Sequence, residues 1–196
     1  MDKINLIKEI IKKRRTIRRF KQKPIEKNIL LELIEYARLA PSAANLQPLK
    51  YLILNNKKLM DDFFPLLSWA AYLGEEGPPP EAQKPTAYII ALNDKNINSR
   101  FAWIDMGAAF ENMLILATAY GIGSCWIDSV KRESAYKILN IPEHLEILDV
   151  IALGYPDEES NYEDLIDNNI KYYKDNNNKM HVPKRHVKNI VFFNKF

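Results

Sequence analysis

The chain has 196 residues, of which 47% are hydrophobic and 27% are charged, and its formal net charge at pH 7 is +3. These proportions are those of a globular domain and argue against a largely disordered chain. No apolar run reaches the roughly 20 residues that a membrane-spanning helix needs, and the lysine-punctuated N-terminus lacks the apolar core of a signal peptide. We therefore expect a single domain over residues 1–196, in the cytoplasm and without a membrane partner.

Redox chemistry by the chain's own thiols is excluded, because Cys125 is the only cysteine. A single thiol can neither form an intrachain disulfide nor cycle with a second thiol. The three histidines, His144, His181 and His186, lack the spacing of metal ligands, so we expect no metal site. Any redox role must then be carried by a cofactor.

The N-terminal region combines a helix pattern with a basic run. Apolar spacing over residues 4–11 predicts a helix that ends near Arg14. If the next residues are extended, Arg14, Thr16 and Arg18 project to one side, where two guanidiniums and a hydroxyl could grip a phosphate. The alternative is a solvated basic patch at a helix C-terminus, where cations are favoured. Eight of the residues from 12 to 23 are lysine or arginine, an excess that favours an anionic partner.

A second helix pattern, over residues 30–37, leads into a segment of small residues. Pro41 should end the helix, and the residues after it are small or able to hydrogen-bond locally. We call residues 41–45 the small-residue turn, since its backbone can lie against a flat surface. Residues 49–54 are predicted to form a buried strand. Taken alone, the segment is equally well an ordinary helix-to-strand connection.

The middle of the chain is less regular. Residues 57–67 have a helical pattern, and residues 87–92 are predicted to form a second buried strand. Between them, residues 68–85 contain two glycines and three consecutive prolines, which predicts an irregular loop that is either a lid or a plain connection. Aromatic side chains at the start of this loop could cover a substrate or belong to the core, and we assign them no role.

Residues 101–120 form the longest helix pattern, with apolar side chains on nearly every side. Such a helix must be buried all round, and a domain of this size can hardly enclose it, so we expect part of it to pack against a second copy. Asp105, Glu111 and Asn112 interrupt the pattern. Hydrogen bonding within the core or the dimer seam explains these three better than catalysis does.

Glycines at 121 and 123 end this helix, and residues 124–127 are predicted to form a short strand followed by a turn. The GIG sequence is a helix end and not a phosphate loop, because no strand precedes it. We expect Cys125 to be a small buried hydrophobe. A helix over residues 131–140 and a third buried strand over residues 147–153 follow.

The C-terminal part turns polar after residue 154, yet residues 187–196, VKNIVFFNKF, are strand-like. The large apolar side chains of this segment need a place of burial, so we expect a C-terminal arm of about residues 180–196 to embrace a partner subunit. Lys184 and Arg185 lie near its start, in what the residues alone describe equally well as a charged surface turn.

Four motifs in this order, RRTIR, PSAANLQP, GIGSCWI and HVPKR, resemble the nitroreductase family of flavin mononucleotide (FMN) oxidoreductases. The resemblance spans nearly the whole chain. It implies an α+β fold with three α-β-α layers, a central mainly antiparallel sheet, and a homodimer that exchanges C-terminal arms. It also implies FMN as cofactor, NADH or NADPH as electron donor, and a ping-pong transfer of hydride to a small-molecule acceptor such as a nitroaromatic, a quinone or an enone.

The same resemblance implies the cofactor-binding residues. Those near the FMN phosphate are Arg14, Arg15, Thr16, Arg18, Lys184 and Arg185. The flavin ring would rest on the small-residue turn of the same or the partner subunit, which comprises Pro41, Ser42, Ala43, Ala44 and Asn45. Its edge would pass Trp126, Ile127 and Asp128. No side-chain acid or base is required, so no catalytic residue is predicted. The chain departs from the family pattern at Leu49, where tryptophan is frequent, and at Thr16, where serine is usual.

Two other functions stay open. A flavin-binding sensor or store would have the same site without turnover. The basic run could instead bind nucleic acid, but no recognised reading element accompanies it, so we expect no nucleic-acid partner.

Overall fold

β5 (Leu145–Pro156) is the strand around which the central sheet is built, because its 12 residues are long enough to pair with three other strands. The other strands of this sheet are β1 (Phe20–Lys21), β2 (Leu49–Leu54), β3 (Ala87–Asp94) and β4 (Gly123–Ile127). β1, β3 and β4 all pair with β5, and β2 pairs with β3, in each case antiparallel. The predicted antiparallel sheet is thus confirmed.

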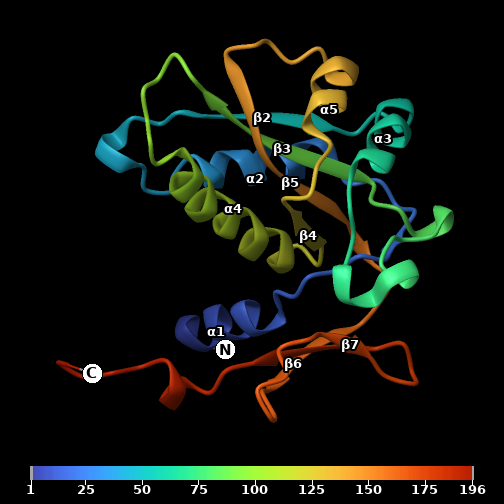
Figure 1. Ribbon diagram of the computed structural model, residues 1–196, viewed down its shortest axis with the longest axis vertical. Helices are drawn as coiled ribbons and strands as arrows, with labels where there is room; N and C mark the ends of the chain where they lie inside the picture. Colours follow the sequence, from blue (N-terminus) through green and yellow to red (C-terminus); the bar gives the residue numbers. More distant parts are fainter. Residues whose placement is uncertain (1, 196) are drawn as a thin grey trace.

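The computed structural model, which describes residues 2–195, has helices on both faces of this sheet (Figure 1). Alternate residues of β3 point to opposite faces. Ala87, Ile89 and Ala91 join the core beneath α2 (Lys27–Ala37) and α4 (Ala102–Ala119). Tyr88, Ile90 and Leu92 join the core beneath α3 (Lys57–Phe63) and α5 (Arg132–Leu139). This arrangement confirms the three-layer α-β-α architecture of an α+β fold.

α1 (Lys3–Lys13) lies outside these layers, below α4 in Figure 1. None of its residues is buried, and its apolar residues Ile4, Leu6, Ile7 and Ile11 are all exposed. The predicted helix is confirmed, and most of its apolar face is exposed in the single chain, although Ile10 is half-buried.

α4 meets the expectation that a single chain cannot enclose it. Its inner side is buried, but Trp103 is 46% exposed and Ile104 is 69% exposed, so a single chain does not bury the helix all round.

The predicted helix over residues 57–67 is α3 continued by a 3-10 turn, Phe64–Leu66, because Pro65 lacks the N–H that the α-helix needs. Within the predicted irregular loop lie two short 3-10 helices, Ala71–Glu76 and Glu81–Gln83.

A second, smaller sheet follows β5 and was not predicted. β6 (Ser160–Asp164) pairs in parallel with β8 (Met180–Lys184), which pairs antiparallel with β7 (Tyr173–Lys174). This small sheet lies below α1 and the central sheet in Figure 1.

The prediction of a strand over residues 187–196 was wrong within the described residues. Val187–Asn189 is a 3-10 turn, and no strand occurs between residues 187 and 195. The segment extends away from the body of the molecule, and Phe193 is 84% exposed (Figure 1). A strand needs a neighbouring strand for its backbone hydrogen bonds, and none of the strands within residues 2–195 pairs with this segment. Across residues 2–195, no helix combines the length and the apolar character needed to span a membrane.

Candidate functional site

The segment that follows α1 is extended and runs beside the start of β4. Arg14 has φ −63° and ψ 103°, and Thr16 forms a parallel bridge with Ser124. The backbone N–H of Ile17 donates to the carbonyl oxygen of Ser124 at 2.8 Å. Glycine is required at position 123, because a Cβ there would lie 2.9 Å from the Cβ of Ile17. The two segments can therefore approach closely enough to fix the basic stretch against β4.

The side chains of this stretch alternate as predicted from Thr16 onward. Ile17 and Arg19 are buried, whereas Thr16 and Arg18 are half-buried. Arg19 has a structural role, since its guanidinium donates to the carbonyl oxygens of Gly77, at 3.2 Å, and of Glu76. Arg18 projects to the opposite side of the backbone from Ile17 and Arg19.

Three cations gather at the end of α1. Partial burial, followed by the charges of Arg15 and Arg14, lowers the pKa of Lys184, which comes from β8. Burial and the charge of Arg14 likewise lower the pKa of Arg15. Within residues 2–195, the only ion pair of these three cations joins Arg14 Nε and Glu111 Oε1, at 3.6 Å. The positive charge is therefore mostly uncompensated, and the cluster favours an anion.

Two tyrosine rings cover the guanidiniums of Arg15, which belongs to this cluster, and of Arg18. The Cζ of Arg15 lies 5.4 Å from the ring centroid of Tyr162, and that of Arg18 lies 4.9 Å from the ring centroid of Tyr172. The Nε atoms of Arg15 and Arg18 are buried without a hydrogen-bond partner among the described residues. Buried polar groups are nearly always paired, so these two donors fit an anionic group that the chain itself does not supply.

Arg18 also lines a pocket of about 230 Å³ together with Trp126, Ile127 and Asp128. The structure thus places one of the predicted phosphate-binding arginines beside all three predicted ring-edge residues. Trp69 lines the same pocket, and its Nε1 is a further buried donor without a partner among the described residues. Sequence reasoning assigned Trp69 no role, because nothing in the irregular loop showed which of its aromatic residues turns inward.

Cys125 lines this pocket as well, but it is buried, as predicted. Burial raises the pKa of its thiol to about 11. The sulfur therefore stays protonated at neutral pH, and since the thiolate is the reactive form, Cys125 is not an activated nucleophile.

The small-residue turn is held by a carboxylate from α4. Ser42 Oγ donates to Asp105 Oδ2 at 2.8 Å, and the backbone N–H of Ala43 donates to Asp105 Oδ1 at 3.0 Å. Ala44 and Asn45 both have left-handed backbone conformations, with φ of 50° and 54°. The predicted hydrogen bonding of Asp105 within the core is confirmed. The sequence does not indicate that Asp105 binds the small-residue turn, because only the fold brings this side chain and the turn together.

Glu111 and Asn112, the other two residues that interrupt the apolar pattern of α4, are not buried. Glu111 is exposed and pairs with Arg14, and Asn112 Nδ2 donates to the carbonyl oxygen of Tyr36 at 3.1 Å. Neither residue lies in the core of the single chain, and the other expected position, in a dimer seam, stays a prediction.

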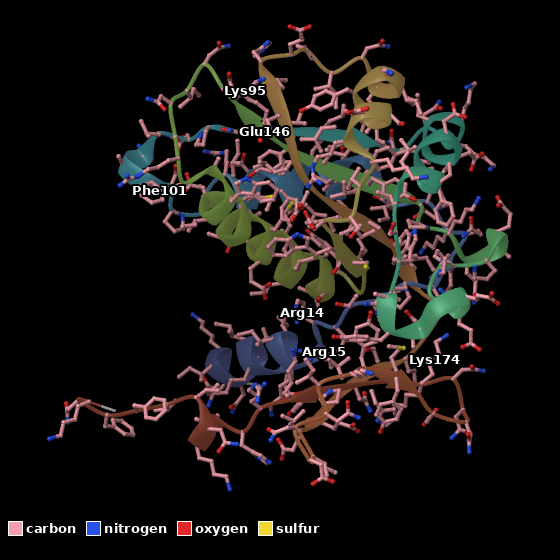
Figure 2. All side chains as sticks on the ribbon, in the orientation of Figure 1. Arg14, Arg15, Lys95, Phe101, Glu146 and Lys174 are labelled. Carbon is pink, nitrogen blue, oxygen red and sulfur yellow. The ribbon has the colours of Figure 1, made fainter. Side chains whose placement is uncertain are left out.

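The small-residue turn and the cationic cluster lie toward different ends of α4. Pro41 and Ala43 line an apolar hollow of about 320 Å³ with Phe101 and Ile104, at the N-terminal end of the helix. Figure 2 shows Arg14 and Arg15 facing the other half of α4, away from Phe101. Arg185 is exposed, directly after β8, and has no ion pair within residues 2–195.

A buried carboxylate supports the far side of the pocket. Trp126 Nε1 donates to Asp149 Oδ2 at 2.6 Å, and Arg132 Nη2 lies 3.4 Å from Asp149 Oδ1 and 3.0 Å from Asp128 Oδ1. Burial raises the pKa of Asp149 to about 6, against the opposing effect of the Trp126 hydrogen bond. The sequence signal for this carboxylate is an aspartate inside the apolar strand EILDVIALG. Over residues 2–195, no cluster of His, Cys, Asp and Glu is arranged to hold a metal ion.

A model of the nitroreductase family matches residues 11–155. The chain belongs to the nitroreductase family. It is 30% identical over 162 residues to a candidate NADH dehydrogenase/NAD(P)H nitroreductase from Archaeoglobus fulgidus, a match that covers 79% of this chain and 87% of the relative. A second relative, a Thermus thermophilus NADH dehydrogenase, is 30% identical over 176 residues, covering 75% of this chain and 85% of the relative. These relatives support an oxidoreductase enzyme.

Solved structures share the nitroreductase fold. The crystal structure of a candidate NADH dehydrogenase/NAD(P)H nitroreductase from Bacteroides thetaiotaomicron has a TM-score of 0.74 at 20% identity, covering 98% of this chain and 99% of that one. An FMN-dependent nitroreductase from Clostridium difficile has a TM-score of 0.68 at 23% identity, covering 95% of this chain and 98% of that one. The predicted family and fold are thus confirmed.

Proposed function

We propose that this protein is an FMN-dependent oxidoreductase that passes a hydride from NADH or NADPH to a small-molecule acceptor such as a nitroaromatic, a quinone or an enone, in a ping-pong sequence. The observation that carries the proposal is the pocket that Arg18, with its unpaired Nε–H, lines together with residues 126–128. The names of relatives support it, since they include an NAD(P)H nitroreductase and an FMN-dependent nitroreductase.

The cationic cluster would bind the phosphate of FMN. Arg14, Arg15 and Arg18 would donate from the extended stretch together with the hydroxyl of Thr16, and Lys184 would donate from β8. Each charge-assisted hydrogen bond of this kind contributes about 1.5 to 3 kcal/mol. Arg185 would join them if the end of β8 turned toward the phosphate, since it is the next residue along the chain.

Residues 126–128 and Trp69 would surround the flavin ring. Bound FMN would supply the hydride chemistry, while the chain binds the cofactor, orients it and limits the access of water. No residue of the pocket has to act as an acid or a base. The protonated thiol of Cys125 agrees with this assignment, because it offers neither a nucleophile nor a base at neutral pH.

We further propose a homodimer in which the small-residue turn of one subunit covers the flavin of the other. The separation of the turn and the cationic cluster along α4 supports a shared site, since one chain does not bring the two together (Figure 2). The exposed apolar residues of α1, α4 and the C-terminal arm support the dimer itself.

The experiment that tests the cofactor is purification followed by absorbance spectroscopy. We expect a yellow protein whose flavin absorbance is released on denaturation and which takes up added FMN. A colourless protein that binds no added FMN would rule the proposal out.

Anaerobic stopped-flow mixing with NADH and with NADPH then tests turnover. Bleaching of the flavin, followed by reoxidation by a nitroaromatic, a quinone or an enone, is the expected result. Flavin that is bound but not bleached by either nucleotide would instead support a sensor or a store.

A further inference from the structure

Tyr162 and Tyr172 belong to a part of the chain that the family pattern does not describe. The family match ends at residue 155, whereas Tyr162 lies on β6 and Tyr172 lies directly before β7. Both rings nevertheless reach back to the basic stretch after α1, where Tyr162 covers Arg15 and Tyr172 covers Arg18.

The contacts are suited to holding a guanidinium without using up its donors. An aromatic ring over the face of a guanidinium attracts the cation through the ring quadrupole, while the N–H groups point outward in the guanidinium plane. The face is thereby fixed, and the Nε–H of each arginine has no acceptor among the described residues, while Arg15 Nη2 donates to the carbonyl oxygen of Ile11 at 3.5 Å. Tyr172 is itself braced, because its ring lies 5.0 Å from that of Tyr72.

Neutral rings also preserve the positive charge of the site. A carboxylate in the same place would hold an arginine equally well but would compete with an incoming anion. Two carboxylates of the neighbouring segment have partners other than the guanidiniums of Arg15 and Arg18. Glu158 accepts the backbone N–H groups of Arg18 and, at 3.2 Å, Arg19, and Glu163 pairs with His181 at 2.8 Å.

We propose that Tyr162 and Tyr172 are positioning residues that orient Arg15 and Arg18 toward the phosphate of FMN, so that the small sheet sets the preference for phosphorylated over unphosphorylated flavin. This inference rests on the proposed function. It adds to it a role for residues 156–184, which cover the cations instead of merely packing beside them.

The test compares the affinities for FMN and riboflavin, measured by flavin fluorescence, in the wild type and in Tyr162→Leu, Tyr172→Leu and Tyr172→Phe. We expect each leucine variant to lower the preference for FMN over riboflavin by about 3- to 10-fold, the range of a lost cation–π contact. Riboflavin affinity should stay within about 2-fold, since riboflavin has no phosphate. The phenylalanine variant keeps the ring and should keep the preference.

Tyr36→Leu is the matched control, because Tyr36 is a comparably exposed tyrosine on α2, 46% against 48% for Tyr162. It should leave both affinities unchanged. If Tyr172→Leu does not fold, Tyr162→Leu decides, since its half-exposed ring contributes little to the core.

The outcomes separate this inference from the proposed function. A wild type that prefers FMN, with leucine variants that keep the same preference, would overturn the inference alone. An equal loss of FMN and riboflavin affinity would also overturn it, because it would show a general structural role. A wild type that binds neither flavin would overturn the proposed function and the inference with it.

Discussion

Asp105 in α4 holds a turn that lies 63 positions earlier in the chain, and it does so with both carboxylate oxygens. The side chain is buried, so its loss would leave two donors, the hydroxyl of Ser42 and the N–H of Ala43, without acceptors. We predict that Asp105→Ala lowers the free energy of unfolding by about 2 to 4 kcal/mol, the combined effect of two charged hydrogen bonds and partly unpaired donors. Urea unfolding measures this change.

Glu111→Ala is the control for that prediction, since Glu111 is an exposed acidic residue of the same helix. Its single 3.6 Å contact with Arg14 predicts a change below about 1 kcal/mol. If the two variants lose equal stability, Asp105 does not hold the turn in solution.

Asp149 makes the stability depend on pH. Burial raises its pKa from the ordinary 3.8 to about 6 in the folded state, so between these values the folded protein binds more protons than the unfolded chain. Its contribution to stability must then fall as the pH rises from about 4 to about 6. Asp149→Asn keeps an acceptor for Trp126 but cannot titrate. We predict that the stability of the wild type relative to this variant falls by about 1 to 2 kcal/mol over that range.

Urea unfolding of both proteins between pH 4 and pH 7 tests this prediction. Taking the difference removes the titration of the carboxylates that do not interact with Asp149, so that only Asp149 and its neighbour Asp128 contribute. A difference that does not vary with pH would show that Asp149 titrates normally.

The sequence predicted those site residues whose positions follow from local geometry. The basic stretch is an example, because an extended backbone alone separates Arg18 from the buried Ile17. Trp69 and Asp149 were missed because their neighbours come from distant parts of the chain, and periodicity carries no information on such pairs. The positions of Tyr162 and Tyr172 over the arginines depend on a sheet that was itself not predicted.

At the scale of elements, one histidine side chain contacts residues from all three strands or their ends in the small sheet. His181 of β8 has Nδ1 2.8 Å from Glu163 on β6 and Nε2 3.3 Å from Asp175, and its ring stacks on Tyr173 of β7 at 5.0 Å. Hydrogen bonding to Glu163 is the largest cause of its raised pKa. Because the pKa is raised in the folded state, this contribution is fully present below the ordinary value of 6.5 and is lost as the pH rises through the raised value.

We therefore predict that backbone amides of β8 become less protected from hydrogen exchange as the pH increases above about 6.5, after correction for intrinsic exchange rates. In His181→Gln the protection should be lower and independent of pH over the same range. Amides of β3 in the central sheet serve as the internal control. A pH dependence that persists in His181→Gln would assign the effect to another group.

Element prediction succeeded where the pattern was long and apolar, as in α4, β3 and β5. These elements form the core, so the burial of their apolar side chains determines how those side chains are spaced along the sequence. It failed for β6, β7 and β8, which have two to five residues each and only one buried residue, Met180. It failed in the opposite sense for residues 187–195, where a strand was predicted and none of the described strands pairs with the apolar segment.

For the whole molecule, the unburied apolar surface is the feature that matters most. Exposed large apolar residues occur on α1, at the N-terminal end of α4 and along the C-terminal arm, and these residues are Ile4, Leu6, Ile7, Ile11, Trp103, Ile104, Val187, Ile190, Val191, Phe192 and Phe193. Extensive exposed apolar surface is typical of an interaction site. We expect sedimentation to give a mass twice that of the chain, and deletion of residues 187–196 to weaken this association.

A shared site in such a dimer makes a stronger prediction about FMN binding. Arg18→Ala breaks the cationic side of the site, and Asp105→Ala releases the small-residue turn. If each site takes its cations from one subunit and its turn from the other, a mixed dimer of the two variants contains one site with both parts intact. If both parts come from one chain, every site of the mixed dimer is broken.

We therefore predict that each variant alone binds FMN at least about 10-fold more weakly than the wild type, as expected for loss of a charged contact. After the two are unfolded together and refolded as a mixture, about a quarter of all sites should bind with wild-type affinity, since half of the dimers are mixed and each of these has one intact site. Flavin titration of the mixture, against each variant refolded alone, measures this fraction. A mixture that binds no more tightly than its components would place the turn and the cations of each site in the same chain.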